Sequence, residues 1–142
     1  MNMSAIRESA FQVLFAQEMQ KDFLEEQVDL YLAENKIQEI DAKNYIMDVT
    51  KGVSKNNSEI LEKIKKYLKP EWKLERISKI NLVILKLAIY ELTYTETPFK
   101  VVINEAVELS KKYGDDTSSV FVNGILASVV GENPDENRTN NS

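Results

Sequence analysis

The sequence predicts an all-α fold of about seven helices in two packed helical sub-bundles. Apolar residues recur at three- and four-residue spacing along most of the 142 residues, and runs that alternate polar and apolar residues are missing. The segment from Ile80 to Leu92 is apolar almost all round and, at 13 residues, is longer than a typical buried strand. The chain also has only 4 Gly and 3 Pro, too few for the many turns of an all-β protein.

Three helices are expected before residue 56. Ser4 is a good N-cap for the first helix, and Asp22 followed by Glu25 has the form of a capping box that opens the second. The third helix is expected over about residues 39–54. The residues expected to face inward are Ile6, Ala10, Val13 and Leu14, then Leu24, Val28, Tyr31 and Leu32, then Ala42, Tyr45, Ile46, Val49 and Val53.

Polar residues 56–58 interrupt the pattern and divide the expected domain, residues 1–130, into sub-bundles of about 1–56 and 57–130. Ser58 is a plausible N-cap for a fourth helix, and Pro70 ends it because proline lacks a backbone donor and clashes with the preceding turn. The fifth helix is the apolar segment 80–92. A helix without a polar face must be surrounded by other helices, so we expect it at the centre.

The last two helices follow from their turn residues. Thr97-Pro98 reads as a cap followed by proline at the first helical position, and Gly114 is the expected stop of the sixth helix. The seventh is expected to open at Asp116 or Thr117. Residues 131–142 (GENPDENRTNNS) lack hydrophobic side chains and are predicted to be a disordered tail.

Composition excludes several classes of protein. With no cysteine and no histidine, the chain lacks the nucleophiles, bases and ligands of thiol enzymes, Ser-His triads and most zinc sites. Glu105 and Glu108 share a helical face, but ion pairing with Lys111 or Lys112 explains them at least as well as acid–base catalysis. We therefore expect no enzyme activity, no cofactor and no metal. No apolar run is long enough to span a membrane, so a cytoplasmic protein is expected.

The charge is unevenly distributed, although the net charge is −5. Residues 51–86 carry 10 basic and 4 acidic side chains, whereas the segments on either side are acidic. Such a basic segment fits phosphate binding, but from charge alone a solvated helical face is the simpler explanation. The cations are Lys51, Lys55, Lys63, Lys65, Lys66, Lys69, Lys73, Arg76, Lys79 and Lys86.

Aromatic residues with polar neighbours are candidates for stacking on RNA bases, with cations nearby for the phosphates. These candidates are Phe15, Tyr67, Trp72, Tyr113 and Phe121. For any single one, packing within the fold is the simpler explanation. Asn104 and Asn123 interrupt apolar helices, and hydrogen bonding within the fold is a simpler explanation of each than ligand contact.

Four segments together resemble the NusB family. They are residues 87–92 (LAIYEL), 98–111 (PFKVVINEAVELSK), 121–126 (FVNGIL) and, in the first helix, 7–15 (RESAFQVLF). Their order and spacing fit the family, and the match covers essentially residues 4–130. The resemblance implies a bacterial all-helical transcription factor built from two perpendicular bundles.

The resemblance also implies partners and a site. Family members pair with the small-subunit ribosomal protein NusE, mainly through the C-terminal bundle, and the pair binds boxA RNA. With other Nus factors on RNA polymerase, they suppress premature termination, notably of ribosomal RNA transcription. By position, the implied RNA-binding residues of this chain are Arg7, Phe15, Phe121 and Asn123.

The sequence departs from the family pattern in two places. Arg7 is alone where family members carry an arginine-rich arm, and Thr117 and Val120 stand where an acidic and a basic residue are usual. Two alternatives therefore stay open: a helical interaction module with weak or lost RNA binding, and an accessory domain of an RNA-modifying enzyme. Both a monomer and a homodimer fit the sequence.

Overall fold

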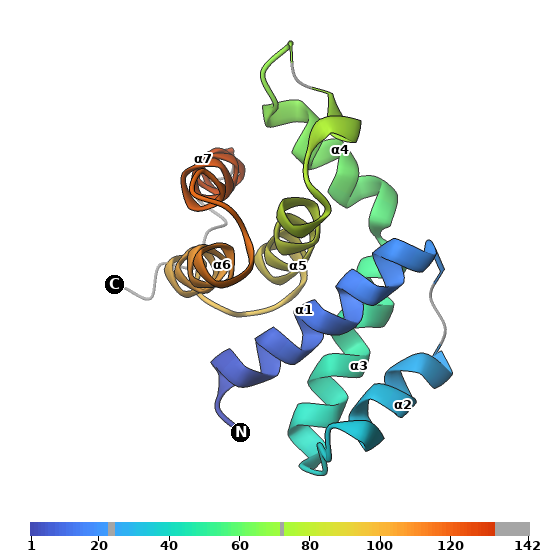
Figure 1. The fold of residues 1–142 in the computed structure, drawn as a ribbon. Coiled ribbons are helices and arrows are strands. Elements are labelled where there is room, and N and C mark those ends of the chain that lie inside the picture. The colour runs from blue at the N-terminus through green and yellow to red at the C-terminus, as the bar shows by residue number, and fades with distance from the viewer. Residues whose placement is uncertain (23–24, 72, 133–142) are drawn as a thin grey trace. The chain divides into compact units, whose positions relative to one another are not determined.

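Two compact helical units, Met1–Asn56 and Asn57–Ser142, make up the chain (Figure 1). The structure is a computed structural model that describes residues 1–22, 25–71 and 73–132. These residues form seven α-helices and one short 3-10 helix, with no strand among them. The all-α prediction of about seven helices is therefore confirmed.

The first unit consists of three helices that enclose a small apolar core. They are α1 (Met3–Gln20), α2 (Glu25–Glu34) and α3 (Ile40–Lys55), and α3 contacts both α1 and α2. The predicted inward-facing residues are buried, except that Tyr31 and Tyr45 are half-buried and Leu24 lies outside the described residues. The periodicity of the sequence therefore assigned the inner faces of these helices correctly.

The start of α1 differs from the sequence prediction. The helix begins at Met3 because the side chain of Asn2 accepts a hydrogen bond from the backbone N–H of Ala5 at 2.8 Å, which is the bond an N-cap residue supplies. Ser4, the predicted cap, lies within the helix. At the other end, Lys21 closes α1 in the left-handed conformation, with φ of 62°.

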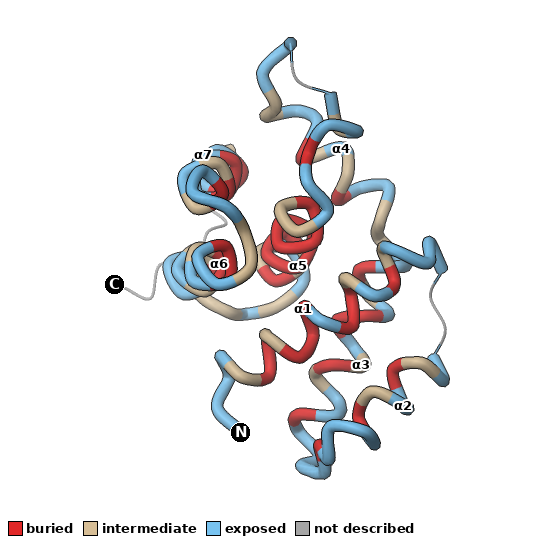
Figure 2. Tube along the Cα trace, in the orientation of Figure 1, coloured by how far each residue is buried: buried red, intermediate tan, exposed pale blue. Residues whose placement is uncertain are grey.

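The second unit is built around one buried helix. It contains α4 (Asn57–Tyr67), the 3-10 helix η1 (Leu74–Arg76), α5 (Lys79–Tyr94), α6 (Phe99–Tyr113) and α7 (Ser118–Gly131). α5 contacts α4, α6 and α7, and every residue from Leu82 to Ile89 is buried (Figure 2). The prediction that this apolar helix is central is confirmed for this unit.

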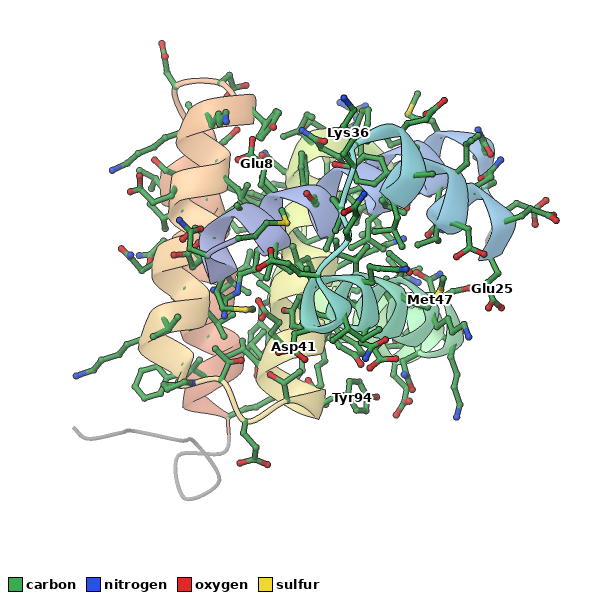
Figure 3. The ribbon with its side chains drawn as sticks, turned by 90° about the horizontal axis from the view of Figure 1, so that it is seen from below. Glu8, Glu25, Lys36, Asp41, Met47 and Tyr94 are labelled. Atoms are coloured by element: carbon green, nitrogen blue, oxygen red, sulfur yellow. The ribbon has the colours of Figure 1, made fainter. Side chains whose placement is uncertain are left out.

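The two ends of α5 are fixed by different interactions. At its start, the hydroxyl of Ser78 accepts a hydrogen bond from the backbone N–H of Asn81 at 3.1 Å. Near its end, where Figure 3 labels Tyr94, the ring centroids of Tyr90 and Tyr94 lie 5.3 Å apart. The Tyr94 hydroxyl donates a hydrogen bond to Glu59 of α4 at 3.3 Å. These contacts stabilise both ends of the central helix.

Two predicted helix starts in the second unit are displaced by one residue. α4 begins at Asn57, so Ser58 lies inside the helix instead of capping it. Pro98 is the capping residue of α6, which begins at Phe99, whereas Thr97 was the predicted cap. The fixed φ of proline suits either position, and sequence alone does not separate them.

The α6–α7 connection confirms two sequence predictions. α6 ends at Tyr113 with Gly114 as its capping residue, and Thr117 is the N-cap of α7. The carboxylate of Asp115 accepts hydrogen bonds from the backbone N–H and hydroxyl of Thr117 at 2.9 and 2.8 Å, and from the hydroxyl of Ser118 at 3.2 Å. These bonds, those from Thr117 first, lower the pKa of Asp115.

The first residue of the expected tail lies in a helix. The tail was expected from Gly131, but this residue is the last of α7, and Glu132 closes the helix and contacts α4. The remainder of the expected tail, 133–142, lies outside the described residues. No helix in the part of the chain that the structure describes is long and apolar enough to cross a membrane.

Candidate nucleic-acid interface

Phe15 is a partly exposed aromatic side chain near the middle of α1. Phe11, one turn earlier, is only 2% exposed, and the two ring centroids are 6.2 Å apart. Residues four apart on a helix are surface neighbours, so the buried ring supports one side of the half-exposed ring. The Phe11 contact therefore restricts the movement of the Phe15 ring, and part of the Phe15 side chain stays exposed.

Arg7 lies on the buried side of the same helix. It is 5% exposed and already interacts within the folded protein. Together with Ala10, Phe11 and Leu14 it follows the i, i+3, i+4, i+7 spacing of an inward face, a signal that the sequence carried. In this structure Arg7 therefore presents little surface to a ligand.

Phe121 and Asn123 stand in the first half of α7. Phe121 is half-buried, whereas Asn123 is exposed. The Asp115–Thr117–Ser118 hydrogen bonds fix the turn from which α7 starts, and so fix the position of Phe121 one turn into the helix. Val120, three residues before Asn123 and on the same face, is 76% exposed.

The four predicted site residues are thus shared between the two units. Arg7 and Phe15 belong to the first unit, and Phe121 and Asn123 to the second. Asn104, the other amide noted in the sequence, is also exposed on α6. In neither case does burial force the amide into a hydrogen bond within the fold, which was the simpler explanation of these residues.

Part of the basic segment is ion-paired or buried. Lys51 pairs with Glu25 at 3.4 Å, and Lys65 pairs with Glu62 at 3.4 Å. Lys86, in the core helix α5, is only 8% exposed. The remaining cations are exposed, apart from the half-buried Lys63: Lys55, Lys66, Lys69, Lys73, Arg76 and Lys79. The segment therefore offers a smaller positive surface than its composition indicates.

Lys63 and Lys66 converge on a single carboxylate at the end of α7. Lys63 contacts Oε1 of Glu132 at 2.6 Å, and Lys66 contacts Oε2 at 3.1 Å. The hydroxyl of Tyr67 also donates to Oε2 at 2.5 Å. We call these four residues the Glu132 cluster. They lie in the second unit, where α4 contacts α7.

The electrostatics of the Glu132 cluster favour the charged carboxylate. Hydrogen bonds from Lys63 and then Tyr67 lower the pKa of Glu132 from 4.5 to about 2. The hydrogen bond to Glu132 is also the main reason why the pKa of Lys66 and the pKa of Tyr67 are raised. At neutral pH the cluster therefore holds one carboxylate between two ammonium groups and a phenol.

Sequence reasoning missed this cluster. Glu132 fell within the predicted tail, and its partners are 65 to 69 residues away in the chain. The one signal in the sequence was the group of lysines on α4, which favours a nearby anion. Of the other predicted aromatics, half-buried Tyr113 has the ammonium group of Lys112 5.6 Å from its ring centroid, and Trp72 lies outside the described residues.

The described residues show no metal centre, since no three acidic side chains among them group closely enough to hold an ion. Glu108 pairs with Lys111 at 3.5 Å, as the sequence suggested, which explains its position without catalysis. The fold and the partly exposed rings thus define a helical binding protein with aromatic, amide and cationic groups at its surface.

The chain belongs to the NusB family, whose family model matches residues 4–131. It is 49% identical over 131 residues to the transcription antitermination protein NusB of Acetivibrio thermocellus, covering 92% of this chain and 89% of that protein. It is 42% identical over 133 residues to the protein of the same name from Clostridium botulinum strain Alaska E43, covering 92% and 98%.

Solved structures show the same fold. NusB of T. maritima matches with a TM-score of 0.85 and 34% identity, covering 93% of this chain and 92% of that one. A chain from a crystal structure of the antitermination factors NusB and NusE in complex with double-stranded RNA matches with a TM-score of 0.83 and 25% identity, covering 92% and 96%. The resemblance noted in the sequence is therefore confirmed at the level of the family and the fold.

Proposed function

We propose that this chain is a transcription antitermination factor that pairs with the ribosomal protein NusE and binds boxA-type RNA. The complex would join other Nus factors on RNA polymerase in the cytoplasm and suppress premature termination, especially of ribosomal RNA transcription. The chain would act by assembly and not as an enzyme. Relatives carry the name of this function, and a structural neighbour was crystallised with NusE and RNA.

The observation that carries the RNA-binding part is the half-exposure of Phe15 and Phe121. Each ring is anchored by its helix yet keeps an open surface, the arrangement that allows a ring to stack on an unpaired base. Asn123, exposed on α7, would add a hydrogen bond to a base or the backbone. Arg7 completes the proposed set, and its burial favours positioning the first helix over direct phosphate contact.

We expect NusE to supply many of the cations that contact the RNA phosphates. Lys51 and Lys65 are ion-paired and Lys86 is buried, so this chain offers fewer cations to the phosphates than its basic segment contains. Affinity falls as salt rises, and on a single strand each phosphate that a protein leaves without a cation makes the slope of log affinity against log salt less steep by about 0.7. We therefore expect weak RNA binding by the free chain and much tighter binding once NusE adds its own charge.

A fluorescence titration with labelled single-stranded boxA-type RNA tests this function. The chain is titrated alone and with NusE, and a scrambled RNA of equal length and composition serves as the control. Tight binding of the boxA RNA with NusE, and weaker binding of the scrambled RNA, is the expected result. Pairing and RNA binding must strengthen each other equally, because coupling between two sites is reciprocal.

Two observations also fit a second function. The buried Arg7 and the neutralised lysines also fit a helical interaction module with weak or lost RNA binding. That alternative predicts a complex with NusE that has no preference for boxA RNA over the scrambled control. The same titration therefore separates the two functions.

A further inference from the structure

The Glu132 cluster has the donor arrangement of an anion-binding site. Three donors from two adjacent turns of α4 point at two oxygens that carry one negative charge between them. The side chain of Glu132 is 15% exposed, and a depression of about 370 Å³ lined by Glu62, Lys63, Lys66 and Glu132 opens beside it. The site is therefore reached from solvent without unfolding either helix.

A phosphodiester of RNA matches the group that Glu132 now supplies. It carries one negative charge on two non-bridging oxygens, as a carboxylate does, and ammonium and hydroxyl groups bind both. Exchanging one anion for the other would keep the same three donors satisfied: one oxygen for Lys63, the other for Lys66 and Tyr67. The exchange therefore leaves none of the three donors without an acceptor.

The surroundings favour a nucleic-acid strand over an isolated anion. Glu62, the other carboxylate at the depression, is paired with Lys65, so release of Glu132 would leave two uncompensated ammonium groups. The ammonium group of Lys66 also lies 5.4 Å from the ring centroid of Tyr67, which places an aromatic face beside a cation. Further exposed cations follow in the chain at Lys69, Lys73 and Arg76.

Release of Glu132 would not disrupt α7. The backbone N–H of Glu132 bonds to the carbonyl of Val129 at 3.3 Å, and this bond does not involve the carboxylate. The side chain stands at the very end of the helix, where rotation about its own bonds moves the carboxylate away. The Glu132 carboxylate can therefore move away from its three donors while α7 stays folded.

We propose that Lys63, Lys66 and Tyr67 form a phosphate-binding site for the backbone of single-stranded RNA, and that Glu132 occupies this site in the free protein. This inference rests on the proposed RNA-binding function and adds to it a second contact region and a built-in competitor. RNA affinity is then set partly by how readily Glu132 gives up its three donors.

The test compares RNA affinity with and without the competing carboxylate. Glu132→Gln removes the charge and keeps the side-chain size, and it is titrated with boxA-type RNA in the presence of NusE. We expect affinity to rise about tenfold, the effect of charge-assisted hydrogen bonds made available to the RNA. The matched control is Glu62→Gln, which removes the same charge at the same depression without releasing Lys63 or Lys66.

The lysines are then removed in the Glu132→Gln background. Lys63→Gln with Lys66→Gln should abolish the gain and make the slope of log affinity against log salt less steep by about 1.4, or about 0.7 for each lysine. Lys65→Gln in the same background should keep the gain. Circular dichroism confirms that each variant is folded.

The possible results distinguish this inference from the proposed function. If the original protein with NusE binds boxA RNA but Glu132→Gln gives no gain, the phosphate site is wrong and the function stands. A gain of equal size in Glu62→Gln, or a gain that survives removal of both lysines, also overturns the site. Absence of RNA binding by every variant, with NusE present, overturns both.

Discussion

Replacing Glu132 by glutamine should change how the stability of the protein depends on acidity. The folded-state pKa of Glu132 is lowered from 4.5 to about 2 by hydrogen bonds from Lys63 and Tyr67. A carboxyl group with a lowered pKa contributes stability that is fully present above its unfolded value. This contribution should therefore be complete above pH 4.5 and disappear as the pH falls towards about 2.

The magnitude follows from the same shift. The full difference between the two pKa values corresponds to about 3 kcal/mol. Solvent weakens these contacts, because the side chain of Lys66 is 62% exposed and that of Lys63 is 31% exposed. We therefore expect the original protein to exceed Glu132→Gln by about 1–2 kcal/mol in free energy of unfolding at neutral pH.

Urea denaturation of both proteins from about pH 6 down to about pH 2 checks this prediction. The difference between the two free energies should be constant at the upper end and shrink towards zero at the lower end. Glu62→Gln serves as the control, since its carboxylate is 74% exposed and its pair with Lys65 should contribute less than about 1 kcal/mol. Curves for the original protein and Glu132→Gln that stay parallel throughout would show that the charge of Glu132 does not stabilise the fold.

Other substitutions test the packing of the second unit, each by chemical denaturation. Leu85→Ala should lower the free energy of unfolding by about 2–5 kcal/mol because Leu85 is fully buried, and half-buried Tyr90→Ala should cost less; equal costs would contradict the burial order. Gly114→Ala should destabilise by about 1–3 kcal/mol, because its Cβ would lie 2.6 Å from the Cβ of Ser118. Gly124→Ala has open space around it and should stabilise α7 by up to about 1 kcal/mol, so a destabilisation there would count against this packing.

Helix burial and helix ends could be predicted from the sequence where they depend on neighbouring residues in the chain. The apolar run in α5 indicated its burial before any partner was known, and Gly114 and Thr117 marked the connection that the structure has. The first helix start was misplaced because Asn2 and Ser4 are both good caps, and which one acts depends on side-chain geometry. The predicted and observed helix starts therefore differ by only one or two residues.

The site was less predictable because it depends on contacts between residues far apart in the chain. The burial of Arg7 was readable from its spacing with Ala10 and Leu14, yet its likeness to a family motif favoured an exposed role. The pairing of Glu132 with Lys63 joins residues 69 apart, and no local pattern identifies such a contact. Contacts of this kind depend on how helices pack, which the sequence does not state directly.

The most direct test of RNA binding through the two rings is the affinity of the NusE-bound protein for boxA-type RNA. It is measured for Phe15→Ala, for Phe121→Ala and for the double variant. Loss of one stacked base is worth about 1–3 kcal/mol, or roughly 5- to 150-fold in affinity, and the two losses should add. Phe99→Ala, an equally half-buried aromatic on α6, should leave the affinity unchanged. If the three variants stay folded and bind the RNA as tightly as the original protein, the two rings do not stack on the RNA and the proposed RNA-binding site is wrong.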